Sequence, residues 1–158
     1  MRLICILTAH CCLFLLSSNA LSKQVREPAF EDFPVRKVFK GKPARPDVSR
    51  GMARRFRTEI RRQAQDGPDF AGHYTVVDWG CGTCCSQFAI VDAQYGKVYF
   101  PFSHIECANT PDGMGHDWQY KIDSDLFILI GARNGKRGGK YYYRWRNNKF
   151  SLVRAIRY

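Results

Sequence analysis

The stretch DWGCGTCCSQFAIVD (residues 78–92) decides how this chain is organised. Three cysteines, Cys81, Cys84 and Cys85, fall within five residues, and the segments on either side alternate between polar and apolar residues as β-strands do. Such a cluster is typical of a redox site, of half a metal site, or of disulfide bonds. Each of these implies a different class of protein, so the compartment in which the chain folds has to be considered first.

The amino terminus has the features of a secretory signal peptide. Residues 1–20 (MRLICILTAHCCLFLLSSNA) carry one positive charge at Arg2, then an apolar run, and close with the small-x-small sequence Ser18-Asn19-Ala20. The apolar run is shorter than the roughly 20 residues that cross a bilayer. We therefore expect cleavage after Ala20 and a periplasmic or secreted protein.

Cleavage leaves an even number of cysteines, which predicts disulfides in an exported chain: Cys81, Cys84, Cys85 and Cys107. Arg2 is lost with the signal peptide, so 24 Lys and Arg remain against 14 Asp and Glu, a net charge of +10. This charge favours a protein partner with an acidic surface or an anionic envelope polymer. Export argues against a nucleic-acid partner.

The first part of the exported chain predicts an irregular segment followed by a helix. Residues 21–46 carry four prolines and scattered charge. From Asp47 onward an apolar stripe recurs every fourth residue, as on an amphipathic helix that ends at Gly67-Pro68: Met52, Phe56, Ile60 and Ala64. The other face of this helix is basic and is either simply solvated or a second-choice binding surface: Arg54, Arg55, Arg61 and Arg62.

After Pro68 the chain has the composition of β-strands. Six segments are rich in β-branched and aromatic residues: 73–79, 87–92, 97–102, 125–132, 141–145 and 150–158. The segment 125–132 (DLFILIGA) is apolar throughout and predicts a central strand buried on both faces. Residues 47–158 are therefore expected to form a single α+β domain, with one amphipathic helix packed on a mainly antiparallel sheet of about six strands built from hairpins and linked by disulfides.

Disulfides explain the cysteines better than redox or metal chemistry. A redox-active Cys-x-x-Cys needs a helix N-terminus to lower the thiol pKa, and Cys84 is instead followed by a strand pattern. Zinc would take Cys81, Cys84, His104 and Cys107, which have suitable spacing, but would leave Cys85 unpaired. We therefore expect no metal and no cofactor.

The pairing of the four cysteines stays open at this point. If Asp92 lies opposite Lys97 across a turn, Cys107 lies opposite Gly82 and so close to the cluster. A bond between the adjacent Cys84 and Cys85 would be strained. Two pairings remain: Cys81–Cys85 with Cys84–Cys107, or Cys81–Cys84 with Cys85–Cys107.

Residues 67–152 resemble a group of small exported bacterial proteins of uncharacterised function. The likeness rests on GPDFAGHYTVVDWGCGTCCSQFAIVDAQYGKVYFPF, with the later DSDLFILIG and YYYRW, which follow the pattern FAGHY…WGCGxxC…FAIVDxxxGKVY. The resemblance implies export and the fold but no activity. Its second cysteine corresponds to Cys85, which favours Cys81–Cys85 with Cys84–Cys107.

Two classes of function fit these features. The first is a non-catalytic binding protein of the bacterial envelope, most simply an inhibitor or immunity protein that blocks an envelope-directed enzyme such as a peptidoglycan hydrolase. The second is a small periplasmic enzyme that uses His104 or His116 with a cysteine or Asp117, although no nucleophile-elbow, metalloprotease or phosphate-loop motif occurs.

Loops held by the disulfides are the expected binding surface, because a rigid scaffold presents them. They are residues 80–86 and 104–118. With the strand residue before them, they offer these candidate contact residues: Trp79, His104, Asn109, Asp112, His116 and Trp118.

Overall fold

The computed structural model describes residues 26–158, and the expected signal peptide (1–20) lies outside them. Residues 26–158 contain two short α-helices and ten strands. The helices are α1 (Gly51–Arg55) and α2 (Arg57–Gln63), with 3₁₀ turns η1 (Phe30–Asp32) and η2 (Ala64–Asp66). The strands are β1 (Tyr74–Gly82), β2 (Cys85–Asp92), β3 (Val98–Tyr99), β4 (Ile105–Glu106), β5 (Ala108–Thr110), β6 (Gly113–Gly115), β7 (Asp117–Tyr120), β8 (Leu126–Arg133), β9 (Gly139–Arg146) and β10 (Lys149–Arg157).

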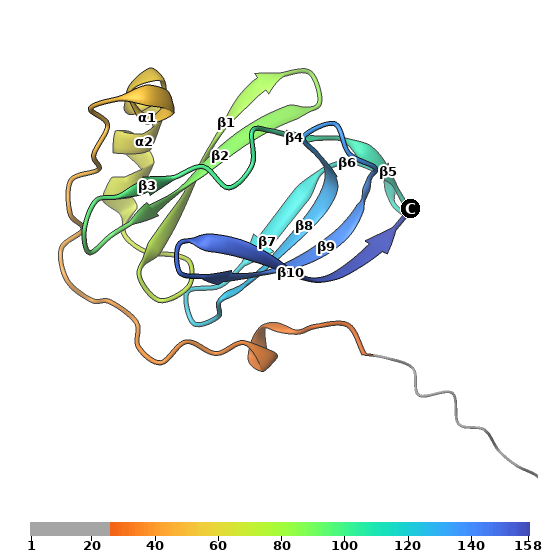
Figure 1. Cartoon of the computed structure of the whole chain (residues 1–158), viewed down its shortest axis with the longest axis horizontal. Helices are drawn as coiled ribbons and strands as arrows, with labels where there is room; N and C mark the ends of the chain where they lie inside the picture. The colour runs from red at the N-terminus through yellow and green to blue at the C-terminus, as the bar shows by residue number, and fades with distance from the viewer. Residues whose placement is uncertain (1–25) are drawn as a thin grey trace, which may run out of the picture.

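The predicted α+β class is confirmed. Six strands form the main path of one antiparallel sheet, in the order β1-β2-β4-β8-β9-β10 (Figure 1). Strand β3 adds to β2, strand β7 adds to β8, and β5 and β6 form a separate hairpin. Strands β5 and β6 lie in a stretch that the sequence marks only as a polar loop.

The helix lies on one face of β1 and β2, as its apolar stripe predicts. Ile60 and Ala64 are buried, and the ring of Phe56 stacks on Trp79 with 4.4 Å between centroids. The helix is interrupted for one residue at Phe56, whose φ of −106° and ψ of 25° separate α1 from α2. Met52 is the exception in the stripe: it lies before this interruption and is 39% exposed.

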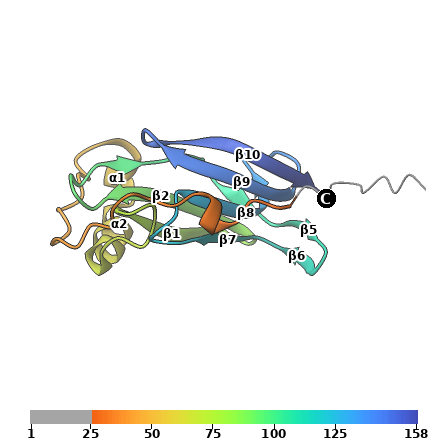
Figure 2. The same cartoon turned by 90° about the horizontal axis from the view of Figure 1, so that it is seen from below.

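The main core lies between two layers of the same sheet. In Figure 2, β9 and β10 lie above β1 and β7, so the sheet curls over itself. Side chains from β1 and β2, such as Tyr74 and Phe88, pack in one cluster with Phe127 of β8 and Trp145 of β9. The hydroxyl of Tyr74 also donates to Oδ1 of Asn148 at 2.8 Å, which ties the β9–β10 turn to β1.

The outer face of β8 and β9 is covered by the N-terminal segment, residues 26–46. Phe30 and Phe33 of this segment pack against a third buried cluster, which consists of Leu126, Ile128 and Tyr142. Strand β8 is therefore buried on both faces, as its continuous apolar sequence predicts.

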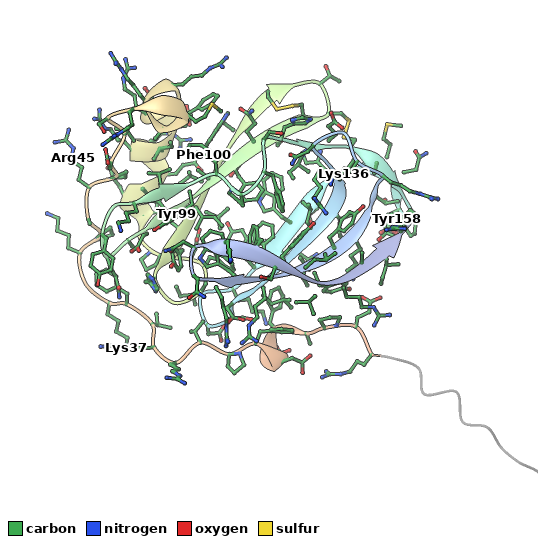
Figure 3. The ribbon with its side chains drawn as sticks, in the orientation of Figure 1. Lys37, Arg45, Tyr99, Phe100, Lys136 and Tyr158 are labelled. Atoms are coloured by element: carbon green, nitrogen blue, oxygen red, sulfur yellow. A yellow bond between two sulfur atoms is a disulfide. The ribbon has the colours of Figure 1, made fainter. Side chains whose placement is uncertain are left out.

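Two glycines allow the N-terminal segment to cross the domain closely. A Cβ at Gly72 would lie 2.5 Å from the carbonyl oxygen of Lys37, and a Cβ at Gly96 would lie 2.2 Å from that of Arg45. Lys37 and Arg45 themselves lie along the outer edge of the molecule (Figure 3). Both glycines have positive φ, and both belong to the pattern that carries the resemblance, FAGHY and GKVY. Gly72 and Gly96 therefore allow a distant segment to pack against the domain.

Between residues 26 and 158 no helix has the length and apolar character needed to cross a bilayer.

Candidate functional site

One disulfide closes the tip of the β1–β2 hairpin, and a second joins this tip to the chain after β4. The pairs are Cys81–Cys85 and Cys84–Cys107, with Cα atoms 5.1 and 5.2 Å apart, and they are the pairs that the resemblance favours. Disulfides of this kind are typical of chains that fold in an oxidising compartment.

The position of Cys107 differs from the one predicted by register. Near the turn the register is as expected: Ile90 pairs with Tyr99, and the amide of Asp92 donates to Lys97. Residues 100–104 then leave the sheet, and strand β4 returns with its register shifted by two residues. As a result the amide of Cys107 donates to the carbonyl of Cys84 and not to Gly82.

The structure does not bring the predicted contact residues into one patch. Side chains alternate between the two faces of a strand. Trp79 is 9% exposed and lies on the helix face, the face of β1 and β2 that the helices cover. Its indole N–H donates to the side chain of Gln87, and the Gln87 amide donates to the carbonyl of Ser103. Trp118 lies on the opposite face, against Phe88 of the main core.

His104 belongs to the helix face and forms a polar chain with three neighbours. Its Nε2 lies 3.0 Å from Oε1 of Glu106, and its Nδ1 lies 3.0 Å from Oγ of Ser103. The Ser103 hydroxyl is 2.8 Å from Oδ1 of Asn134, an oxygen that already accepts the Ser103 amide. The hydroxyl therefore donates to Asn134, and the imidazole of His104 lies between the Ser103 oxygen and the Glu106 carboxylate.

His116 lies on the core face, between a disulfide and β2. Its Nδ1 is 3.3 Å from Sγ of Cys107, and its Nε2 is 3.0 Å from Oγ of Ser86. The enzyme alternative required a histidine with a cysteine or Asp117. Cys107 is bonded to Cys84, and the side-chain hydrogen bonds found for His116 go to Cys107 and Ser86 rather than to Asp117.

Asn109 and Asp112 lie on the β5–β6 hairpin, which projects from the end of the molecule (Figure 2). Its turn is closed by the Thr110 hydroxyl, which donates to the carbonyl of Gly113 at 2.6 Å. Met114 is 75% exposed on this hairpin. A cavity of about 300 Å³ opens beside it, lined by Asn109, Met114 and Tyr158 among others.

Met114 and Tyr158 were not predicted from the sequence. The sequence offered one signal for Met114: it is an apolar residue between two glycines of a polar loop, where no neighbouring apolar residues indicate a core. No comparable signal marks Tyr158, which reaches this surface because β10 ends beside the hairpin (Figure 1).

The second-choice surface is present on the helix. Its four arginines, Arg54, Arg55, Arg61 and Arg62, are exposed as predicted. Arg62 pairs with Glu59 at 2.8 Å, and the guanidinium of Arg55 lies over the ring of Phe56 at 5.4 Å. Nothing in these contacts distinguishes the face from a solvated helix surface.

Within residues 26–158 no three His, Cys, Asp or Glu side chains gather in a way that would hold a metal ion. The cysteines that the zinc alternative required are all in disulfides.

No family model, no curated protein and no solved structure matches the chain. The resemblance described for residues 67–152 therefore stays a prediction.

Proposed function

We propose that this chain is an exported binding protein of the bacterial envelope, and that it acts as an inhibitor or immunity protein for an envelope-directed enzyme such as a peptidoglycan hydrolase. The observation that carries the proposal is the β5–β6 hairpin. It follows directly on a disulfide-bonded residue, Cys107, and presents Met114 to solvent beside the cavity next to Tyr158.

A hairpin of this kind suits insertion into an enzyme cleft. An exposed methionine adapts to irregular apolar surfaces. The Cys84–Cys107 bond and the closed turn fix the backbone before binding, which reduces the ordering cost of association. The net charge of +10 after loss of residues 1–20 favours a partner whose cleft is bordered by acidic groups. An anionic envelope polymer is the alternative partner for the same charge.

Inhibition assays test the function and the site separately. The protein without residues 1–20 is added to peptidoglycan-clearing assays with glycosidase and amidase hydrolases, and we expect stoichiometric inhibition of one class. Met114→Ala should weaken that inhibition by about tenfold or more if Met114 is an interface anchor. The control is Tyr95→Ala. Tyr95 is about as exposed as Met114, and it follows the end of β2 that lies away from the disulfides.

Two results would count against the proposal in different ways. If neither hydrolase class is inhibited and no protein is captured from an envelope extract, the function is wrong. If inhibition occurs but Met114→Ala and Tyr95→Ala both leave it unchanged, the hairpin is not the contact surface.

A further inference from the structure

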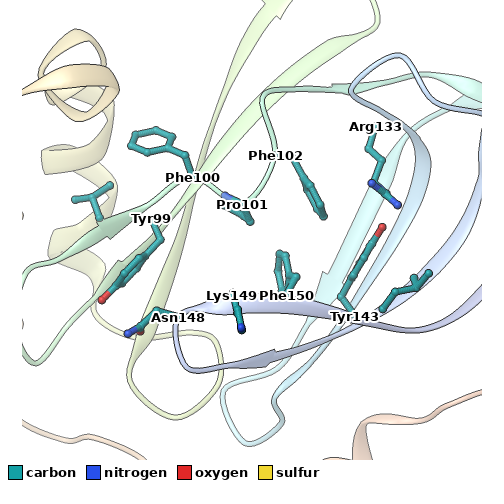
Figure 4. A pocket seen from close by; sticks show the side chains of 11 residues that line it. Tyr99, Phe100, Pro101, Phe102, Arg133, Tyr143, Asn148, Lys149 and Phe150 are labelled. Carbon is teal, nitrogen blue, oxygen red and sulfur yellow. The ribbon is translucent and has the colours of Figure 1, made fainter.

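A cavity larger than the one beside Met114 lies away from this hairpin. It has a volume of about 670 Å³ and lies between residues 98–102, which follow β2, and the β9–β10 hairpin (Figure 4). A cavity of this size accommodates a small organic molecule. It shares no lining residue with the cavity beside Met114.

One wall of the cavity holds a cation surrounded by aromatic rings. The guanidinium carbon of Arg133 lies 5.6 Å from the ring centre of Phe102, 5.4 Å from that of Tyr141 and 5.5 Å from that of Tyr143. Its Nε is buried without a hydrogen-bond partner. None of the ion pairs found among residues 26–158 includes Arg133. Cation–π contacts stabilise such a charge only in part, so an anion brought to it would gain a strong partner.

Tyr143 supplies a second unused donor at the same wall. The residue is only 3% exposed, and its buried hydroxyl has no acceptor for its proton, because the guanidinium of Arg133 beside it can only donate. In Figure 4 this hydroxyl points toward the guanidinium of Arg133. Burial raises the pKa of Tyr143 to about 12 against the opposing effect of Arg133, so the hydroxyl keeps its proton at neutral pH. Buried donors without partners are uncommon and mark places where a ligand can bind.

The other residues that line the cavity indicate which charge and shape a ligand must have. Lys149 and Asn148 lie at the turn that borders the cavity, and no acidic residue lines it. The other walls are mainly aromatic, from Tyr99, Phe102 and Phe150. A ligand here therefore needs a negative charge at one end and a flat apolar body.

We propose that this cavity binds an aromatic carboxylate, with the carboxylate on Arg133 and the Tyr143 hydroxyl and the ring among the aromatic walls. A single planar guanidinium matches the two oxygens of a carboxylate. A phosphate would call for a second cation beside Arg133, whereas the groups found around its guanidinium are the rings of Phe102, Tyr141 and Tyr143. The site goes beyond the proposed function and gives the chain a small-molecule ligand in addition to a macromolecular partner.

Binding of three probes with one ring system tests the proposal. They are naphthoate, the neutral naphthalene carboxamide and naphthyl phosphate, titrated by calorimetry against the protein with both disulfides intact. We expect naphthoate to bind in the micromolar to millimolar range and about tenfold more tightly than either of the others, the factor that corresponds to 1.4 kcal/mol.

Three variants test which residues bind the ligand. Arg133→Met keeps the apolar stem of the side chain and should weaken naphthoate binding by about tenfold or more. Tyr143→Phe removes only the hydroxyl and should weaken it by about three- to tenfold. Lys136→Gln is the control, because it removes an exposed charge in the turn after Arg133 and should change nothing. Thermal unfolding of each variant shows that it is folded.

The proposal is overturned if naphthoate does not bind the native protein, or if Arg133→Met binds it as tightly as the native protein does. It is also overturned if naphthyl phosphate binds more tightly than naphthoate, because the site would then select phosphate. Met114→Ala should bind naphthoate normally, so loss of hydrolase inhibition and loss of ligand binding report on different surfaces.

Discussion

At the scale of single residues, Asp69 makes folding depend on pH. Its Oδ1 accepts the amide of Val76 at 2.9 Å, and its Oδ2 lies 3.4 Å from the hydroxyl of Tyr120. Burial, the largest effect, raises the pKa of Asp69 from 3.8 to about 6, although the Val76 amide acts in the opposite direction. The folded state therefore prefers the protonated carboxyl, and this contribution to stability is complete below the unfolded pKa and is lost as the pH rises through the folded pKa.

Asp69→Asn should remove that loss. From about pH 4 to pH 7 the native protein should lose stability relative to Asp69→Asn. The difference between their free energies of unfolding should change by on the order of 2 kcal/mol. This is less than the full pKa shift implies, because Asp69 keeps some contact with solvent. Urea unfolding at several pH values measures the difference. Asp112→Asn, at the exposed hairpin tip, is the control. A difference between Asp69→Asn and the native protein that does not vary with pH would exclude this assignment.

Gly96 shows how a distant segment constrains one position. Gly96 and Gly135 have nearly the same backbone, with φ of 73° and 68°. A Cβ at Gly135 would meet nothing within 4 Å, whereas at Gly96 it would lie 2.2 Å from the carbonyl oxygen of Arg45. Gly135→Ala should therefore lower the free energy of unfolding by about 1 kcal/mol, the backbone cost alone. Gly96→Ala should cost about 3 kcal/mol or more, because the N-terminal segment must also move. Equal losses in denaturant unfolding would contradict this account.

At the scale of elements, the two disulfides should contribute unequally. Cys84–Cys107 closes a loop with a sequence separation of 23, whereas Cys81–Cys85 closes one with a separation of 4. In the chain-entropy model the longer loop is worth about 3 kcal/mol and the shorter about 2 kcal/mol. Replacing Cys84 and Cys107 together by alanine should therefore destabilise the protein more than replacing Cys81 and Cys85.

Amide hydrogen exchange gives a second measurement of the same difference. Loss of Cys84–Cys107 should speed exchange in β5 and β6, because this bond ties the start of the hairpin to the end of β1–β2. Loss of Cys81–Cys85 should leave exchange in β5 and β6 near its native rate. The reverse order would show that the hairpin is held by its other contacts.

At the scale of the whole molecule, the N-terminal segment belongs to the folded domain. Ser124 is 1% exposed, and its hydroxyl lies 2.8 Å from the carbonyl of Phe30 and 3.1 Å from that of Phe33. The same oxygen accepts the amide of Leu126. Glu27 adds an ion pair with Lys140 at 2.8 Å, and hydrogen bonds from Lys140 and Tyr142 lower the pKa of Glu27.

Ser124→Ala should loosen this segment. It leaves the buried amide of Leu126 without its acceptor and removes the donor to Phe30, a loss of about 1–3 kcal/mol. Limited proteolysis should then cut within residues 26–46 faster than in the native protein. Ser151→Ala, on exposed β10, should leave the cleavage rate unchanged. Equal rates for Ser124→Ala and the native protein would show that the segment is held elsewhere.

Features that depend on local period and composition could be predicted from the sequence. The apolar stripe through Ile60 predicted the helix, and the unbroken apolar run of 125–132 predicted a strand buried on both faces. These features follow from the side-chain periods of 3.6 residues in a helix and two residues in a strand, which can be recognised in a short segment of sequence. The cysteine count and the resemblance together gave the disulfide pairs.

Which distant side chains meet could not be predicted in this way, because it depends on the folded arrangement of the strands. Trp79 and Trp118 fall on opposite faces because strand pairing fixes where each points, and the departure of residues 100–104 from the sheet shifts Cys107 by two positions. The cavity at Arg133 likewise joins residues 98–102 to the β9–β10 hairpin, far apart in sequence. Their meeting depends on how the sheet curls and on what packs between its layers, and no local pattern encodes either one.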